Sequence, residues 1–310
     1  MIGFNEVDIT FTNDNINEKK LIIIYQDKRA GKIVLKKGES ENIIGWFLSI
    51  ELNQKSRNLG IGTIGMLKFL LNNDIEVLYA NVRKSNIPSI KLLEKIGFKK
   101  YQVTTSGQLI YRYDYVKLTG IVEVLNKVNR SDFYPSVLID LINLCAIPAK
   151  KAIRIPYKNN EIDLLNIFKD FADKNALDFC YDEQFVIISK EKNAQLIHEV
   201  DLSSEKHVKQ LGELLGYPSC CVNFMNQYEE NEIDKVEIDI SGERNYKEYW
   251  KLIDPKNYRI GRSLISHVPC SESCVNSLIY AVLVLIFIKK LENEFPFFKS
   301  LVEESELLLT

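Results

Sequence analysis

Cysteine, histidine and tryptophan are scarce in this chain of 310 residues, which has six cysteines, three histidines and two tryptophans. A strong charge of either sign is also lacking, because 40 lysines and arginines nearly balance 42 aspartates and glutamates. A near-neutral chain has no overall electrostatic attraction to nucleic acid, which makes a nucleic-acid partner unlikely. Few cysteines in a reducing compartment also argue against a disulfide framework.

Long hydrophobic runs and a leader segment are absent as well. The first ten residues, MIGFNEVDIT, have neither a basic stretch nor an apolar core, which predicts a cytoplasmic protein. The longest apolar run covers residues 278–288, whereas a helix needs about 20 residues to cross a bilayer, so we expect a buried core helix there and no membrane partner. A hydrophobic content of 46% predicts a folded protein of two domains.

Strand patterns organise the first third of the chain. Alternating or apolar stretches at residues 6–12, 20–26, 31–37 and 42–52 predict four strands, the middle two as a hairpin. A glycine-containing turn, RNLGIGT, follows and leads into a stretch with apolar residues at helical spacing. Residues 74–82 then predict a buried strand, and a short helix with Pro88 in its first turn ends at Gly97.

The turn RNLGIGT has the properties of a phosphate-binding loop. Gly60 and Gly62 allow the backbone to come close to a ligand because they have no Cβ atom. The first amides of the helix that follows, together with its dipole, favour phosphate oxygens. Two glycines at this spacing are also common in an ordinary strand-to-helix turn, so the motif depends on its context.

Two motifs of the first third resemble those of the GNAT acyltransferase superfamily. That family has an Arg/Gln-x-x-Gly-x-Gly/Ala loop at the start of a helix, matched here by Arg57, Gly60 and Gly62. It later has an asparagine and a Tyr-Glu-Lys-x-Gly-Phe segment, matched here by Asn86 and by LLEKIGF. The two motifs occur in the family's order and at about its spacing, and the resemblance covers residues 43–101.

The resemblance implies an α/β domain with a compact mixed sheet that binds acetyl-CoA or another acyl-CoA. In such a domain the loop amides hold the pyrophosphate, the strand that ends near Leu52 pairs with the pantetheine arm, and Asn86 bonds to that arm. The implied acyl-CoA residues are Leu52, Arg57, Asn58, Leu59, Gly60, Ile61, Gly62, Thr63 and Asn86.

Two features depart from the family's pattern. Where the family often has a tyrosine that protonates the leaving thiolate, this chain has Leu93, which cannot donate a proton. The two helices that usually separate the first two strands are missing, since residues 13–19 are too few to form them. The acceptor pocket must then be small, open or completed by the rest of the chain.

Glu51 is the candidate general base, by its position near the end of a strand. A solvated carboxylate at a strand end is the simpler interpretation of the same residue. Direct attack with a proton relayed by water needs no fixed base, and a domain that binds acyl-CoA without catalysis needs only the loop.

The pattern becomes helical from about Val122. We therefore predict a GNAT-like domain over residues 1–120 and a mainly α-helical domain over residues 121–310, with one hairpin at residues 177–190. Gly216 and Pro218 are expected to end a helix. The chain has no linker rich in proline, glycine or serine between the two domains.

Four of the six cysteines form two pairs, each preceded by a proline and expected at a helix start. They are Cys220 with Cys221 and Cys270 with Cys274. A helix start lowers the pKa of a thiol and favours the thiolate that binds metals. One interpretation is a four-thiolate metal site, with His267 as a substitute ligand. Because zinc usually has paired ligands two to four residues apart and Cys220 and Cys221 are adjacent, a [4Fe–4S] cluster is placed ahead of zinc.

Two other interpretations of the cysteines stay open. They could be inert core residues, which we accept for the isolated Cys145 and Cys180. Alternatively, Cys220 and Cys221 could form a vicinal disulfide with redox chemistry. The segment around them also resembles an uncharacterised prokaryotic family with Gly-Tyr-Pro-x-Cys-Cys and His-x-Pro-Cys stretches, over about residues 122–298, which implies no known activity.

One stretch of the second domain, residues 243–262, combines lysines and arginines with interleaved tyrosines and a tryptophan. Such a stretch can stack on bases. A solvated amphipathic helix is the preferred interpretation, because an acidic run precedes it.

The sequence thus predicts an N-acyltransferase that moves an acyl group, most simply acetyl, to a small-molecule or peptide amine selected by the second domain. The alternative is a cluster- or thiol-dependent enzyme centred on the cysteines of the second domain, in which the first domain binds its ligand without catalysing a reaction. A third hypothesis is a metal-stabilised recognition module. The sequence specifies neither the acceptor nor the oligomeric state.

Overall fold

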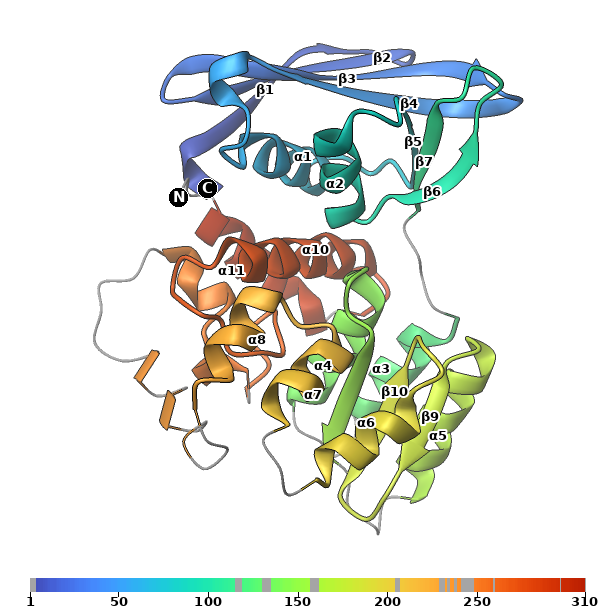
Figure 1. Cartoon of the computed structure of the whole chain (residues 1–310), viewed down its shortest axis with the longest axis vertical. Helices are drawn as coiled ribbons and strands as arrows, with labels where there is room; N and C mark the ends of the chain where they lie inside the picture. The colour runs from blue at the N-terminus through green and yellow to red at the C-terminus, as the bar shows by residue number, and fades with distance from the viewer. Residues whose placement is uncertain are drawn as a thin grey trace. The chain divides into compact units, whose positions relative to one another are not determined.

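The computed structural model divides the chain into two compact units, Met1–Tyr115 and Val116–Thr310. It describes residues 4–114, 119–129, 135–156, 162–203, 207–228, 232, 235–236, 239–240, 248–258, 260–295 and 297–309. Figure 1 shows the elements of each unit. The first unit is a mixed α/β structure built on one sheet, and the second is mainly helical with a small sheet.

The first unit contains a seven-stranded sheet in the order β1-β2-β3-β4-β5-β7-β6. All neighbours in it are antiparallel except β4 and β5. The strands are β1 (Val7–Asp14), β2 (Glu18–Tyr25), β3 (Lys28–Ser40), β4 (Ile43–Leu52), β5 (Val77–Val82), β6 (Lys99–Val103) and β7 (Leu109–Asp114), preceded by the 3₁₀ turn η1 (Phe4–Glu6). The four strands and the hairpin predicted for residues 6–52 are therefore confirmed.

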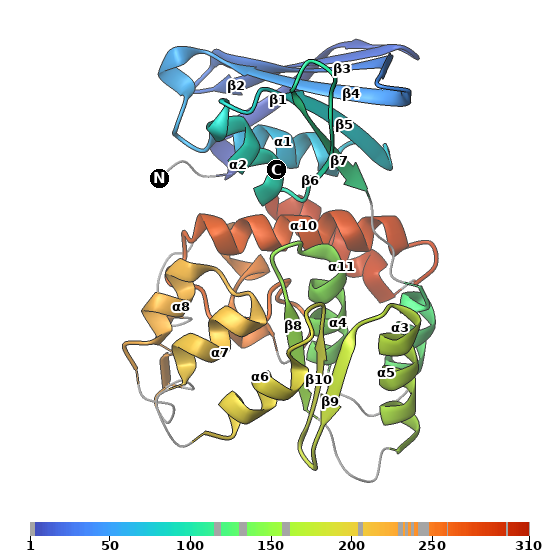
Figure 2. The same cartoon turned by 45° about the vertical axis from the view of Figure 1, so that its right-hand side comes forward.

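Two helices, α1 (Ile61–Leu71) and α2 (Ile87–Lys95), lie on one face of this sheet, as Figures 1 and 2 show. They follow the predicted positions, and a short 3₁₀ turn, η2 (Gln54–Ser56), precedes the first of them. Side chains that alternate along the strands fill the layer between sheet and helices, among them Ile23, Ile33 and Leu48. The side chains of opposite parity, such as Lys32 and Glu51, point to the other face.

The connection between β1 and β2 explains why that other face lacks a helical layer. Only residues 15–17 separate the two strands, and the amide of Asn15 bonds to the carbonyl of Glu18 in a tight turn. The prediction that no helices are inserted here is confirmed. Among the described elements of this unit, both α-helices cover the opposite face of the sheet.

The second unit is mainly helical, as predicted. Its helices are α3 (Ile121–Asn129), α4 (Pro135–Ala146), α5 (Ile162–Lys174), α6 (Ala194–Asp201), α7 (Val208–Leu215), α8 (Ser219–Met225), α10 (Val275–Leu291) and α11 (Phe297–Leu309). Its sheet has the order β8-β10-β9, all antiparallel, with β8 (Ala152–Pro156), β9 (Asp178–Tyr181) and β10 (Phe185–Ser189). The predicted hairpin is β9 and β10, whereas β8 was not expected.

Helix α10 contains the longest apolar run and is buried along most of its length. Of the helices in the described part of the chain, none is long and apolar enough to cross a membrane. Helices α6 and α7 pack against the small sheet through Ile197, Leu215 and Ile187 (Figure 2). Gly216 ends α7 in a left-handed conformation, as its position after the helical pattern predicted.

Candidate functional site

The predicted loop stands at the N-terminus of α1. Gly60 is the residue before the helix and has a φ of 87°, which lies in the left-handed region that glycine adopts without strain. A Cβ atom on Gly60 would meet no heavy atom within 4 Å. The amides of Ile61, Gly62 and Thr63 open the helix and have no intrahelical acceptor. The loop therefore offers donors and a positive helix end beside open space.

Three separate elements meet beside this loop. A Cβ atom on Gly62 would lie 3.1 Å from Leu52 Cδ1 and 3.2 Å from Leu92 Cδ1. Gly62 therefore lets the start of α1 approach the end of β4 and the middle of α2. The Nε atom of Arg57 also donates to the carbonyl oxygen of Leu52, at 3.2 Å, which ties the loop to the strand end. The structure thus brings the loop RNLGIGT together with the end of β4 and with the LLEKIGF segment of α2.

Strands β4 and β5 are parallel but stay together only briefly. The register pairs Trp46 with Leu78 and Phe47 with Tyr79, and no further pairs follow among these described residues. Beyond Phe47, the edge of β4 that faces β5 is free of that partner up to Leu52. This edge leads from the centre of the sheet to the loop, and it carries backbone groups that an extended ligand can pair with.

Asn86 caps the start of α2. Its side-chain oxygen accepts from the amide of Ser89, at 3.4 Å, and the residue is exposed. The same side chain still has its NH₂ group as a donor. Leu93, at the position where GNAT proteins often have tyrosine, is buried on the inner side of α2 with 2% exposure. It contributes to packing and supplies no proton.

Glu51 lies on the sheet face opposite α1 and α2, the helices of this unit in its described part, within a groove of about 740 Å³ across β2, β3, β4 and β5. Its carboxylate is largely exposed and forms an ion pair of 2.9 Å with Lys32. Ser49 and Asn81 line the same groove. The predicted base is thus placed near the parting strands, in a setting that also fits an ordinary surface carboxylate.

Unit 2 brings the four paired cysteines together. The Sγ atoms of Cys220, Cys221, Cys270 and Cys274 all lie within 4.8 Å of one another. Cys221 is 3.8 Å from Cys220 and 3.5 Å from Cys274, and Cys220 is 3.7 Å from Cys274. All four are free thiols, so Cys220 and Cys221 do not form the vicinal disulfide that we had considered.

Helix starts position three of these thiols, whereas Cys270 lies in a bend before α10 and not at a helix start as expected. Cys220 and Cys221 stand in the first turn of α8, and Cys274 is the residue before α10, as predicted. Cys221 shares its proton with Cys274, and this hydrogen bond lowers the pKa of Cys274 to about 4. Burial raises the pKa of Cys270 to about 12. Within the cluster the hydrogen bond from Cys221 therefore favours the thiolate form of Cys274.

Polar groups surround the cluster. The side-chain amide of Asn276 donates to Cys220 Sγ at 3.3 Å, and Ser277 Oγ lies 3.4 Å from Cys221 Sγ. His267 Nε2 lies 2.8 Å from the same Ser277 oxygen, and burial lowers the pKa of His267 to about 3. His267 is therefore neutral and supports Ser277 rather than standing among the thiols. His267 was considered as a substitute for a cysteine ligand, but its Nε2 atom faces Ser277 and not the sulfur atoms.

The other two cysteines are isolated from the cluster. Burial raises the pKa of Cys145 to about 12 and also raises the pKa of Cys180, whose thiol donates to Gln195 Oε1 at 3.2 Å. A protonated thiol is a poor nucleophile and a poor metal ligand. Their environments agree with the inert role assigned to them.

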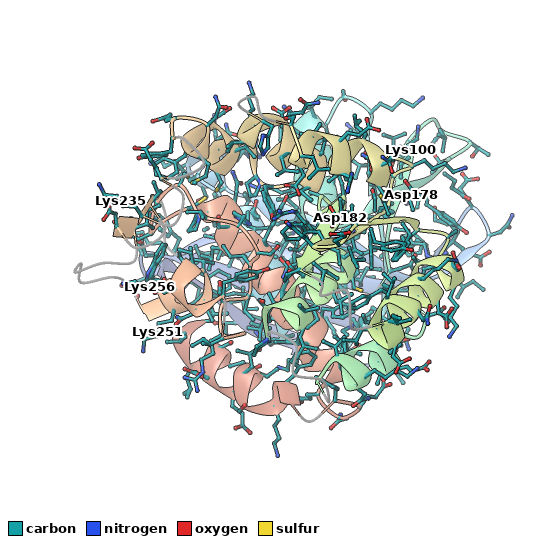
Figure 3. All side chains as sticks on the ribbon, turned by 90° about the horizontal axis from the view of Figure 1, so that it is seen from below. Lys100, Asp178, Asp182, Lys235, Lys251 and Lys256 are labelled. Carbon is teal, nitrogen blue, oxygen red and sulfur yellow. The ribbon has the colours of Figure 1, made fainter. Side chains whose placement is uncertain are left out.

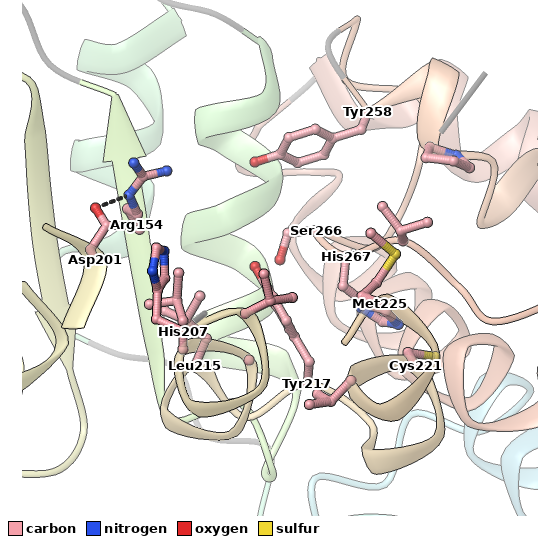
Figure 4. A pocket seen from close by; sticks show the side chains of 16 residues that line it. Arg154, Asp201, His207, Leu215, Tyr217, Cys221, Met225, Tyr258, Ser266 and His267 are labelled. Atoms are coloured by element: carbon pink, nitrogen blue, oxygen red, sulfur yellow. Dashed lines mark hydrogen bonds and ion pairs between the residues drawn. The ribbon is translucent and has the colours of Figure 1, made fainter. Parts of the chain in front are cut away.

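A cavity of about 340 Å³ lies beside the thiol cluster (Figure 4). The ion pair of Arg154 and Asp201, at 2.6 Å, lies at one side of it in this view, and Cys221 and Met225 lie at the other. Its wall comes mainly from α7, α8 and the segment before α10, with one residue each from β8 and α6. Labelled lining residues are Arg154, Asp201, His207, Leu215, Tyr217, Cys221, Met225, Tyr258, Ser266 and His267.

Two buried ionisable residues behind this cavity were not identified from the sequence. Asp140 accepts a hydrogen bond of 2.5 Å from the hydroxyl of Tyr258, and burial raises the pKa of Asp140 to about 6. The ammonium of Lys150 lies 3.9 Å from the centre of the Tyr217 ring, and burial lowers the pKa of Lys150 to about 7. For Asp140 the available signal was a charged residue within the apolar run of residues 137–144, and Lys150 had no such signal.

The stretch rich in lysine and tyrosine is not one amphipathic helix where it is described, so that interpretation is wrong there. It forms two short 3₁₀ turns, η4 (Glu248–Leu252) and η5 (Pro255–Asn257), because Pro255 opens a new turn capped by Asp254. Lys251 and Lys256 point outward (Figure 3), whereas Trp250 is buried. The remaining residues of this stretch, 243–247 and 259, lie outside the described part.

Residues 5–98 match the model of the acetyltransferase (GNAT) family. The N-terminal unit is a GNAT domain. The match covers the strands, the loop and both helices described above. No curated protein matches the chain, and the resemblance noted for the second unit stays an expectation.

Solved structures match the same third of the chain. Mycobacterium smegmatis RimJ in complex with CoA-disulfide is 14% identical, with 32% of this chain and 53% of that chain covered and a TM-score of 0.28. An N-acetyltransferase from Staphylococcus aureus Mu50 is 19% identical, with 31% and 67% covered and a TM-score of 0.28. A domain from Methanocaldococcus jannaschii is 24% identical, with 32% and 68% covered and a TM-score of 0.28. The chain thus spans about half of the length of RimJ.

Proposed function

We propose that the GNAT domain binds an acyl-CoA and transfers its acyl group, most simply acetyl, to an amine. The observation that carries the proposal is the loop at α1, where Gly60 leaves open space in front of the free amides of Ile61, Gly62 and Thr63. A helix N-terminus with such a loop suits a pyrophosphate, because its amides and its dipole both favour negative charge.

The rest of the cofactor follows from the neighbouring elements. The pantetheine arm is an extended chain with amide groups, and the free edge of β4 between Phe47 and Leu52 offers partners for it. The NH₂ group of Asn86 can donate to a carbonyl oxygen of the same arm, since its oxygen is used in the cap of α2. The thioester would then lie where β4 and β5 part.

The chemistry requires a single displacement. The amine nitrogen attacks the thioester carbonyl carbon, the C–S bond breaks, and the amine loses a proton while the CoA thiolate gains one. We assign acceptance of the amine proton to water, and Glu51, which lines the groove and pairs with Lys32, is the candidate side chain to assist it. Leu93 leaves the thiolate without the tyrosine acid, so we assign its protonation to water.

The acceptor is proposed to be a small-molecule or peptide amine that unit 2 selects or presents. The observation in favour of a selecting role is the cavity of about 340 Å³, which combines an ion pair with apolar walls, as small-molecule sites do. Leu211→Trp would fill part of this cavity. We expect it to raise the KM for the acceptor while the binding of acetyl-CoA stays unchanged.

The acyl-CoA proposal is tested by thermal unfolding with and without acetyl-CoA. A ligand at 100 times its Kd stabilises the native state by about 2.7 kcal/mol, which raises the Tm. Gly60→Val should abolish the rise, because its side chain fills the space in front of the amides. Gly107→Val is the matched control, since Gly107 has a similar φ of 79° and equally open surroundings in the turn between β6 and β7.

Turnover is then measured by chromatography of free CoA formed with a panel of amines, which avoids thiol reagents that would modify the protein's own cysteines. A folded wild-type protein that shows no rise in Tm at millimolar acetyl-CoA contradicts the proposal. A rise that Gly60→Val and Gly107→Val reduce equally would place the binding site elsewhere.

A further inference from the structure

We propose that Cys220, Cys221, Cys270 and Cys274 bind a single zinc ion in a closed structural site that fixes one wall of the unit 2 cavity. The proposal concerns the second unit and does not depend on acyl transfer by the first. Its basis is the convergence of four thiols from two regions of the sequence to within 4.8 Å of one another.

The distances between the sulfur atoms favour one ion. Four thiolates at about 2.3 Å from a central zinc form a tetrahedron with edges of about 3.8 Å. The three distances given above, 3.8, 3.7 and 3.5 Å, lie close to that edge length. A small outward adjustment of the thiols is enough to place an ion at their centre.

The same distances argue against the iron–sulfur cluster that sequence spacing favoured. In a four-iron cluster each thiolate binds a different iron, so that the cluster core separates all four sulfur atoms. In a two-iron cluster two thiolates share an iron, and the two pairs stand apart. Here all four sulfur atoms gather around one point, and Cys220 and Cys221 are as close to Cys274 as to each other.

Adjacent cysteines can share one ion here because of how α8 begins. Pro218 precedes the helix with a φ of −58° and a ψ of 131°, and the chain turns into α8 at Ser219. Both thiols of the first turn then point toward the residue that precedes α10. The usual spacing of two to four residues between paired zinc ligands applies to ligands in a loop. At the start of α8, two adjacent residues can both direct their thiols to one ion.

The donor set identifies the metal. Four thiolates in a tetrahedron are typical of zinc or iron, and zinc binds such ligands more tightly than Fe²⁺ in the general order of divalent metals. Asn276 and Ser277 approach the sulfur atoms and can reduce their negative charge, as outer partners of a metal site do. Ser277 is in turn held by His267.

Four thiolates complete the coordination of zinc and leave no position for a substrate, which indicates a structural site. The ion would join the first turn of α8 to the start of α10 and to the loop that carries Cys270. Cys221 also lines the cavity, as do Val222 and Met225 of the same helix. Zinc would therefore hold α8 in the place that gives the cavity its shape.

The test begins with elemental analysis of the full-length protein purified under anaerobic, reducing conditions. We expect about one zinc ion per chain in wild-type protein and in the control variants Cys145→Ser and Cys180→Ser, and less than a tenth of that in Cys221→Ser. Iron with acid-labile sulfide in wild type would overturn the proposal in favour of a cluster. Iron alone, or no uptake of added Zn²⁺ by the metal-free protein, would overturn it too.

Substitution with Co²⁺ gives a second measurement that uses wild type and does not depend on the folding of a cysteine variant. Cobalt bound by four thiolates in a tetrahedron gives intense ligand-field bands in the red and strong sulfur-to-cobalt charge transfer. We expect these bands in wild type and in His267→Gln, and weak octahedral bands would contradict the site. Loss of the bands in His267→Gln would show that the histidine is a ligand and would refute the four-thiolate set.

The role of the ion is tested with a chelator. Its removal should lower the Tm of unit 2, whereas the stabilisation of the GNAT domain by acetyl-CoA should persist. A Tm that the chelator leaves unchanged, while elemental analysis shows complete loss of zinc, would refute the structural role. Since the acetyl-CoA effect is read separately, the two proposals can fail independently.

Discussion

The hydroxyl of Tyr258 donates a hydrogen bond of 2.5 Å to the carboxylate of Asp140, although 118 residues separate them in the chain. This bond joins the segment before α10 to α4, and it lies next to the cavity. Tyr258→Phe removes the donor and leaves a buried carboxyl group with one partner fewer. We expect a loss of about 1–3 kcal/mol in the free energy of unfolding, measured with urea.

The control for this change is Tyr181→Phe, since Tyr181 is 53% exposed at the end of β9. It should leave the free energy of unfolding within about 0.5 kcal/mol of wild type, as surface substitutions usually do. If Tyr258→Phe is equally harmless, the bond to Asp140 contributes nothing measurable to stability.

Lys150 makes the stability of unit 2 depend on pH. Its ammonium is buried against the ring of Tyr217, and burial lowers its pKa to about 7 in the folded protein, compared with about 10.4 in an unfolded chain. Between these values the unfolded chain binds more protons, so the free energy of unfolding rises with pH. We expect this rise from about pH 7 to pH 8.5, below the range in which tyrosines of the unfolded chain titrate.

Lys150→Met isolates this contribution, because methionine keeps the apolar contact and cannot be protonated. The free energy of unfolding of wild type minus that of the variant should increase over the same pH range. The measurement is urea unfolding at several pH values in one buffer series. A difference that stays constant with pH would mean that the ammonium is solvated in the folded protein.

Gly216 tests the backbone at the start of the Gly-Tyr-Pro-x-Cys-Cys stretch. It has a φ of 76°, and an added Cβ atom would collide with the carbonyl oxygen of Ala149 and lie 2.6 Å from the nitrogen of Lys151. Gly216→Ala must therefore move the β8 side of the cavity or unfold it. We expect a loss of more than about 3 kcal/mol, of which the left-handed conformation accounts for about 1–2.

Gly107→Ala provides the comparison, because Gly107 has a φ of 79° and open space around the same position. It should lose only the conformational part, about 1–2 kcal/mol. Equal losses in the two variants would show that the contact with Ala149 is relieved at no cost. Thermal and urea unfolding with two-state analysis of each unit give both values.

Hydrophobic periodicity and turn residues in the sequence predicted those helices and strands that depend mainly on neighbouring residues. The strands β1 to β5, the helices α1 and α2 and the β9–β10 hairpin follow from apolar patterns, helical spacing and the positions of glycine and proline. The glycine turn before α1 was equally accessible, because its conformation depends on consecutive residues of the chain. The elements of unit 1 up to α2 could thus be predicted from the sequence, whereas the order of the strands in the sheet could not.

Contacts between distant segments were not accessible in the same way. The short strand β8 has only Ala152–Pro156, and it is stabilised by pairing with β10 rather than by a pattern of its own. The bond of Tyr258 to Asp140 depends on two side chains that no motif connects. For the cysteines, the sequence predicted the pairing, but spacing along the chain does not contain the turn at Pro218 that brings Cys220 and Cys221 together beside Cys274.

Asn86 allows its structural role to be separated from its proposed binding role. Asp at this position keeps an oxygen that accepts from the amide of Ser89, and a negative charge suits a helix start. It lacks the NH₂ group that would donate to the pantetheine arm. Asn86→Asp should therefore keep the stability of the protein and raise the Kd for acetyl-CoA by about tenfold, the equivalent of one lost hydrogen bond.

Asn86→Ala completes the comparison. It removes the cap as well and should lower the free energy of unfolding by about 1 kcal/mol, in addition to weakening the binding of acetyl-CoA. Calorimetric titration with acetyl-CoA and urea unfolding give the two values. Unchanged binding in Asn86→Asp would remove Asn86 from the acyl-CoA site and leave it with the cap alone.

Glu51 decides whether the GNAT domain uses a fixed base. Its carboxylate is largely exposed and paired with Lys32, so water can take over the transfer of the proton. We expect Glu51→Gln to lower kcat by less than about tenfold, whereas the loss of a true general base lowers it by about 10² to 10⁴. Glu18→Gln is the control, because Glu18 lines the same groove and pairs with Lys36. A loss of 10² or more that is confined to Glu51→Gln, with the acidic limb of the pH profile of kcat removed, would establish Glu51 as the base.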